Sequence, residues 1–189
     1  IIGEKCYCSD NCCPDGTSQD NSATDDQGHG THCAGIVAAD YNSYQGVAPE
    51  ANIIAVKVLD SGGSGYSSDI IAGIDWCVAN ADTYNISVIS MSLGGGTRYA
   101  TACDSQFPGY AQAIDAAAQQ NISVIVASGN DGDTTGISPP ACVDKATSVG
   151  MTYDFDGGGT CWGYVSGDCP GGTYTCYDSA SDMVVDNIV

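Results

Sequence analysis

The sequence of 189 residues has few basic side chains: four lysines and arginines stand against 23 aspartates and glutamates, a formal net charge of −19. Nucleic acids and anionic lipid surfaces are bound through clusters of lysine and arginine, so neither is expected as a partner. No run of residues approaches the roughly 18 apolar residues that a membrane-spanning helix needs. No basic segment followed by an apolar stretch, as in a signal peptide, opens the chain. We therefore expect no membrane association, and an acidic surface that serves solubility.

Motifs for nucleotides and for zinc are also lacking. Neither a Gly-x-Gly-x-x-Gly element nor a P-loop lysine follows a strand-like run. Cys8, Cys12 and Cys13 resemble a metal knuckle, but no second pair with histidines follows them. The eleven cysteines instead indicate disulfides and an oxidising compartment, with at least one thiol unpaired if all the others bridge. Local bridges are expected in two groups whose connectivity stays open: Cys6, Cys8, Cys12 and Cys13, and Cys161, Cys169 and Cys176.

The length and an apolar content of 43% fit one globular domain over 1–189. Three regions differ in character: a Cys-rich loop region at 1–28, a core at 29–151, and a Cys- and Gly-rich segment at 152–189 that runs into a further strand. The core alternates short apolar runs with segments of helical periodicity. Strands are expected at 52–58, 87–92, 123–128, 146–151 and 184–189, and helices at 67–80 and 110–120. This order predicts an α/β fold, a three-layer sandwich with a mostly parallel sheet.

Three segments at strand or helix ends carry unusual sequence. His29 and His32 lie three residues apart between glycines, which is weak evidence for a metal pair and suits a histidine at a helix start that acts as a general base. The run 90–96 is a strand that ends in glycines and could pair with an extended peptide. The run 127–132 places Asn130 at a strand end, where its amide could donate to an oxyanion. Taken singly, each also reads as an ordinary turn.

Together, the blocks GHGTHCAGIVA, GVAPEANIIAVKVLDSGGSG, SMSLGGG and ASGNDG, in this order, resemble the subtilisin-like serine proteases. The similarity covers roughly residues 25–151 and is strongest to the proteinase K-like and related secreted bacterial members. It implies that His29 is the general base of a Ser-His-Asp triad, that Asn130 is the oxyanion donor and that His32 is structural. It also implies substrate-binding roles for Gly63, Ser64, Gly65, Tyr66, Ser92, Leu93, Gly94, Ala127, Ser128 and Gly129.

The triad aspartate and serine are not found at matching positions. In subtilisin the Asp precedes the His by about 32 residues and the Ser follows the oxyanion Asn by about 66, which places both outside residues 1–189. Ser179 lacks the glycine before it and the helix after it that a nucleophile needs. Asp10, Asp25 and Asp26 read as solvated loop acids. We therefore expect the chain to be truncated at both ends and inactive alone.

The resemblance also bears on cysteines and calcium. It favours a Cys103–Cys142 disulfide, and it places Cys33 one helical turn after His29 as the expected free thiol. Catalysis needs no cofactor, but relatives bind structural calcium, for which Asp144, Ala146 and Asn187 are weak candidates.

The sequence thus predicts a secreted, monomeric serine endopeptidase of broad specificity that acts on proteins or peptides. One alternative is a peptide-binding pseudoprotease, which a full-length sequence without the segment that carries the catalytic serine would favour. The other is a metal- or nucleotide-binding module.

Overall fold

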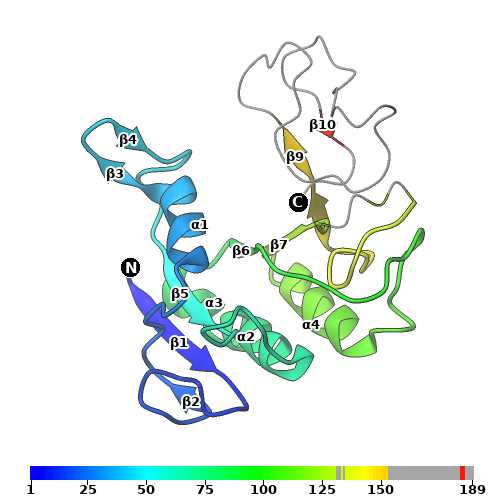
Figure 1. The fold of residues 1–189 in the computed structure, drawn as a ribbon, viewed down its shortest axis with the longest axis horizontal. Coiled ribbons are helices and arrows are strands. Elements are labelled where there is room, and N and C mark those ends of the chain that lie inside the picture. The colour runs from blue at the N-terminus through cyan, green and yellow to red at the C-terminus, as the bar shows by residue number, and fades with distance from the viewer. Residues whose placement is uncertain (131–132, 134, 153–183, 186–189) are drawn as a thin grey trace. The chain divides into compact units, whose positions relative to one another are not determined.

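The computed structural model describes residues 1–130, 133, 135–152 and 184–185. The chain divides into two compact units, one of residues 1–92 and 109–124 and one of residues 93–108 and 125–189. Each unit is described by itself below, with the elements labelled in Figure 1.

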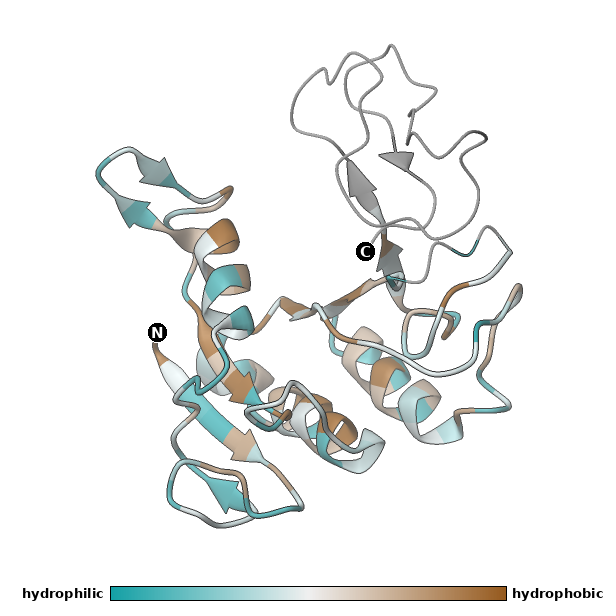
Figure 2. Ribbon diagram, in the orientation of Figure 1, coloured by the Kyte–Doolittle hydropathy of each residue, from teal (hydrophilic) through white to brown (hydrophobic). Residues whose placement is uncertain are grey.

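The first unit is built on a parallel pair of strands, β1 (Gly3–Tyr7) and β5 (Ile54–Lys57). The short strand β2 (Gln19–Asp20) continues this sheet on the other side of β1 and runs antiparallel to it. Helix α2 (Ser67–Ala79) packs against β1, and its Gly73 lies so close to Val56 and Val58 that an added Cβ would stand 2.9 Å from a methyl of Val58. The missing side chain lets the helix approach the sheet. The apolar run of β5 is plain in Figure 2.

Helix α4 (Pro108–Gln119) belongs to this unit from Gly109 onward and approaches α2 where Gly109 lies beside Ile71. Tyr110 and Ile114 are buried on one face, and the α carbon of Gly109 faces the end of Ile71 closely enough that a methyl group there would clash. The remaining helices are α1 (His29–Ala38) and α3 (Ala81–Tyr84). Strand β6 (Val88–Met91) and the hairpin of β3 (Asp40–Tyr41) with β4 (Tyr44–Gln45) complete the unit.

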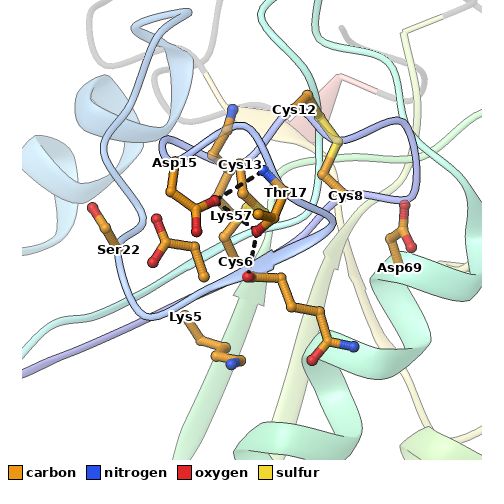
Figure 3. The surroundings of a disulfide bond; sticks show 12 residues. Lys5, Cys6, Cys8, Cys12, Cys13, Asp15, Thr17, Ser22, Lys57 and Asp69 are labelled. Atoms are coloured by element: carbon orange, nitrogen blue, oxygen red, sulfur yellow. Dashed lines mark hydrogen bonds between the residues drawn. A yellow bond between two sulfur atoms is a disulfide. The ribbon is translucent and has the colours of Figure 1, made fainter.

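Two nested disulfides close the loop that follows β1 (Figure 3). Cys6 bonds to Cys13 and Cys8 to Cys12, and Cys6, Cys8 and Cys13 are all buried. The loop is fastened to α2 by the carboxylate of Asp69, which accepts hydrogen bonds from the backbone N–H of Ser9 (2.8 Å) and from its hydroxyl (2.6 Å). Asp69 is only 6% exposed, whereas Ser9 is exposed, so the contact joins a buried carboxylate to a residue at the surface.

The second unit centres on the parallel pairing of β7 (Ser123–Ala127) with β8 (Thr147–Val149), in which Ile125, Val126 and Ala127 face Thr147, Ser148 and Val149. Strands β9 (Met151–Thr152) and β10 (Val184–Val185) form an antiparallel pair. The Cys103–Cys142 disulfide, predicted from the resemblance, is present and both of its cysteines are buried.

The predicted helices and core strands are found within about two residues of their expected bounds. Two expectations need correction. Residues 1–28, expected as a loop region, contain the strand β1. Strand β5 is half-buried along its length, although a continuous apolar run such as 52–58 is typical of a strand buried on both faces. Of the strand expected at 184–189, residues 184–185 form β10 and the rest lies outside the described residues.

Candidate active site

His29 opens α1, as predicted for a histidine at a helix start. Gly28 before it has φ 97°, in the left-handed region that glycine adopts without strain. The backbone N–H of His29 donates to the side-chain oxygen of Gln27 (2.9 Å). Its ring nitrogen Nε2 lies 3.7 Å from the sulfur of Cys33, one turn further along the helix. The imidazole is exposed, so a substrate could reach it.

Asp25 organises the residues around His29. One carboxylate oxygen, Oδ1, accepts the backbone N–H groups of Gln27 (2.9 Å) and Gly28 (2.8 Å). The other, Oδ2, accepts the backbone N–H (2.8 Å) and the hydroxyl (2.6 Å) of Thr31. These four donors, the Thr31 hydroxyl first, hold the pKa of Asp25 well below its usual range. Asp25 is exposed, as expected of a loop acid, yet its carboxylate accepts all four of these hydrogen bonds from groups of the protein.

The predicted substrate-binding segment 63–66 follows β5 and a tight loop. Asp60 holds this loop, because its Oδ1 accepts the N–H groups of Gly62 (2.8 Å) and Ser64 (2.9 Å). Gly63 has φ 78°, and a Cβ on Gly65 would stand 2.5 Å from the carbonyl oxygen of Val58. Both positions therefore require glycine. Gly63 also lies near the side-chain amide of Gln27, which brings this segment close to the start of α1.

Tyr66 ends the segment and is the residue before α2. Its ring is 53% exposed, and its hydroxyl lies 3.5 Å from Oδ1 of Asp10 in the disulfide loop. The negative charge of Asp10 is the main reason that the pKa of Tyr66 is raised. Ser92, predicted to pair with substrate, directly follows β6 and is exposed.

In the second unit, the predicted pocket residues 127–129 extend from the end of β7. Ser128 donates its N–H to the carbonyl of Val149 (3.0 Å), and its own carbonyl accepts the N–H of Ser138 (3.3 Å). Gly129 has φ 121°, so the chain turns there in a conformation that favours glycine. Asn130 follows directly and is exposed.

Leu93 and Gly94 belong to the same unit as this turn. An added Cβ on Gly94 would meet the carbonyl oxygen of Pro139 at 3.1 Å and that of Ala127 at 3.9 Å. The next residue, Gly95, donates its N–H to the Pro139 carbonyl (3.1 Å). The structure thus brings Gly94 beside the predicted pocket wall. His29 lies in the first unit and Asn130 in the second, so each is described with its own neighbours.

The weak calcium candidates gain no further ligands from the described residues. Asp144 donates its backbone N–H to a carboxylate oxygen of Asp104 (3.1 Å), and Ala146 donates its own to the carbonyl of Val143 (3.0 Å). Asn187 lies outside the described residues. Within the described part of the chain, no group of three or more His, Cys, Asp or Glu side chains could hold a metal ion.

Sequence reasoning missed the residues that shape these segments. Asp25, Gln27 and Asp60 do not enter the resemblance as functional residues, yet each fixes backbone beside a predicted site residue through its side chain. A signal was present, since Asp followed within a few residues by Gly, Ser or Thr is typical of loops in which the carboxylate accepts nearby N–H groups.

These features define an α/β protein in which a histidine opens a helix and glycine-containing segments follow parallel strands. The particular family follows from comparison: residues 2–183 match the subtilase family, peptidase family S8, and the chain belongs to it.

Two similar curated proteins come from Bacillus subtilis (strain 168). The serine protease AprX is 43% identical over 149 residues, which cover 74% of this chain and 33% of AprX. The minor extracellular protease Epr is 40% identical over 139 residues, which cover 72% of this chain and 20% of Epr.

Among solved structures, sphericase is similar with a TM-score of 0.63 and 35% identity, covering 75% of this chain and 45% of that one. The predicted α/β fold of the subtilisin type is thereby confirmed. The chain spans less than half the length of each of these relatives. No helix of its described part is long and apolar enough to cross a membrane.

Proposed function

We propose that the protein containing this chain is a serine endopeptidase that cleaves peptide bonds through an acyl-enzyme. The observation that carries the proposal is the match to the subtilase family over 2–183, together with an exposed His29 at the first position of α1. In this mechanism His29 accepts the proton of the nucleophilic serine, and the side-chain amide of Asn130 donates to the oxygen that becomes negative.

Residues 63–66 and residues 92–94 are each proposed to pair with the backbone of an extended substrate. The exposure of residues 63–66, Ser92 and Gly94 supports this role, because an extended peptide can reach these segments. Ala127, Ser128 and Gly129 would line the pocket for the residue before the scissile bond, and their small side chains favour broad specificity.

Secretion is proposed from the density of disulfides and from the similarity to Epr, which is named as an extracellular protease. We further propose a monomer that uses no cofactor in catalysis and binds neither nucleic acid nor membrane. Structural calcium stays a prediction. Because the triad Asp and Ser are expected outside residues 1–189, this segment alone is proposed to be inactive.

A fluorophosphonate probe and casein hydrolysis test the proposal on the full-length protein. Wild-type protein should be labelled and should cleave casein, whereas His29→Ala should lose activity on the order of 10⁴- to 10⁶-fold. His32→Gln is the matched control, because it changes the neighbouring histidine of the same helix and should keep most of the activity. A folded protein that binds peptides but is not labelled would instead be a pseudoprotease.

A further inference from the structure

We propose that Asp25 is a positioning residue for His29: its carboxylate fixes the first turn of α1, from which the imidazole projects. The inference rests on the proposed function, in which His29 is the general base.

The first turn of α1 lacks the usual side-chain cap. A helix normally begins after Ser, Thr, Asp or Asn, whose side chain accepts a free N–H of the first turn. Here the capping position is Gly28, which has no side chain to offer. Asp25, three residues earlier, reaches across this gap and accepts the N–H of Thr31, the third residue of the helix, at 2.8 Å.

The four hydrogen bonds of Asp25 hold the backbone on both sides of His29. Oδ1 binds Gln27 and Gly28, which precede the histidine, and Oδ2 binds Thr31, which follows it. Gln27, placed in this way, accepts the N–H of His29 itself. One carboxylate therefore fixes, directly or through Gln27, the peptide groups from 27 to 31.

Within the described residues, the side chains of Asp25 and Gln27 hold the first turn of α1, because they accept the backbone N–H groups of Thr31 and His29. We infer that these polar contacts help to set the direction in which the His29 ring leaves the helix. A carboxylate at a helix N-terminus is also favoured by the helix dipole. The low pKa of Asp25 is consistent with a carboxylate that accepts several donors.

The adjacent acid has a different contact and supplies a matched control. Asp26 accepts a hydrogen bond from the ammonium group of Lys57 (2.6 Å) and has no described contact with the first turn of α1. Asp25→Asn and Asp26→Asn remove the same charge from neighbouring positions. Only the first removes acceptors from the peptide groups that surround His29.

The test compares kcat and KM of these variants in the full-length protein with a chromogenic peptide substrate. An amide keeps one acceptor oxygen, so Asp25→Asn must lose either the Thr31 pair or the Gln27–Gly28 pair. A displacement of about 1 Å in a catalytic group can cost about 100-fold. We expect kcat to fall about 10- to 100-fold with KM changed less than about threefold, and Asp26→Asn to change kcat less than about threefold.

A second pair of variants keeps the test decisive if Asp25→Asn does not fold. Thr31→Val retains the shape and the N–H of threonine but loses the hydroxyl that donates to Asp25 at 2.6 Å, whereas Thr31→Ser retains the hydroxyl. The kcat of Thr31→Val should fall about 3- to 10-fold, by the same route, and Thr31→Ser should recover most of it. Thermal midpoints of all variants are measured in parallel.

Several results would overturn the proposal: equal losses of kcat in Asp25→Asn and Asp26→Asn, a loss confined to KM, or equal kcat values for Thr31→Val and Thr31→Ser. A wild-type protein that neither cleaves peptide nor reacts with a fluorophosphonate would show a different failure, that of the proposed function itself.

Discussion

Two cysteines in the described part of the chain have no disulfide, and their surroundings differ. Cys33 is partly exposed and lies beside the ring of His29, whereas Cys77 is buried in α2. Burial raises the pKa of the Cys77 thiol to about 11, so this thiol stays protonated at neutral pH. Of these two cysteines, Cys33 is therefore the one placed to react with thiol reagents, since the thiolate is the nucleophile.

We predict that native Cys33→Ser protein titrates one reactive thiol fewer than the wild type with Ellman's reagent, whereas Cys77→Ser titrates the same number. A mercurial should also lower the activity of the full-length wild-type protein partially, because the modified sulfur would stand next to the general base. Complete indifference of the activity to the mercurial would contradict this placement of Cys33.

Three exposed aspartates share one pattern of contacts, in which a threonine hydroxyl donates to the carboxylate. The donors are Thr17, Thr31 and Thr135, and each is the largest cause of a lowered pKa in its partner, Asp15, Asp25 or Asp133. The folded pKa lies below the unfolded value of about 3.9. Stability from these groups is therefore fully present above about pH 4 and is lost as the pH falls through the folded pKa values.

We predict that the urea midpoint of unfolding falls between about pH 5 and about pH 2, and that it falls less steeply in Asp25→Asn. The reason is that an amide has no proton to gain in this range. The comparison with wild type at each pH isolates the contribution of Asp25. Parallel curves for the two proteins would show that Asp25 binds protons equally in the folded and unfolded states.

At the scale of elements, the periodicity of apolar residues predicted the helices well. The residues that form the packing face of a helix lie close together in the sequence, so a local pattern reveals them. In α2, Ile70, Ile74 and Cys77 recur at helical spacing and are buried as expected. Tyr66 precedes the helix without a side-chain cap, and the carboxylate of Asp69, in the first turn, accepts hydrogen bonds from Ser9 instead. The carboxylate of Asp69 contacts a loop that is distant in the sequence, and no local sequence pattern predicts such a contact.

Strand β1 was missed for a related reason. Glu4 and Lys5 give it no apolar run, and it is a strand because its register with β5, fifty residues away, supplies the backbone partners. In the candidate site, the resemblance located His29 and the glycine-containing segments. The bonds of Asp25 and Asp60 could not be predicted, because they depend on the path of the loops rather than on spacing.

The Ser9–Asp69 contact predicts a stability effect for the disulfide loop. Asp69→Ala should lower the free energy of unfolding by about 1–3 kcal/mol, because Ser9 loses two hydrogen bonds to a charged carboxylate, which contribute more than bonds between neutral groups. Ser68→Ala is the control, since Ser68 is exposed in the same turn and should change stability by less than about 0.5 kcal/mol. Chemical denaturation measures both, and equal effects would argue that the contact contributes nothing specific.

The disulfides should differ in their contributions according to the loops they close. Cys103–Cys142 spans 39 residues and Cys8–Cys12 only four. Chain entropy alone gives about 4 kcal/mol for the former and about 2 kcal/mol for the latter. We expect the double serine variant at 103 and 142 to unfold at a lower urea concentration than the double serine variant at 8 and 12. The reverse order would show that the N-terminal disulfides stabilise mainly through folded-state contacts.

For the molecule as a whole, charge is the dominant property. Acidic side chains outnumber basic ones 23 to 4, so ion pairs such as Lys57 with Asp26 and Arg98 with Asp133 can involve few of them. Most acidic groups thus repel one another across the surface. Such repulsion destabilises the compact state and is screened by salt, since the Debye length falls from about 10 Å at 0.1 M to about 3 Å at 1 M.

We therefore predict that the thermal midpoint rises with sodium chloride, by about 2–4 °C for each kcal/mol of repulsion that is screened. Calcium chloride at matched ionic strength separates screening from binding: a larger rise with calcium indicates a specific site, and an equal rise indicates screening alone. The two outcomes also bear on the predicted structural calcium. A midpoint that stays constant or falls as salt is added would mean that the acidic groups are far enough apart, or paired well enough, for repulsion to be unimportant.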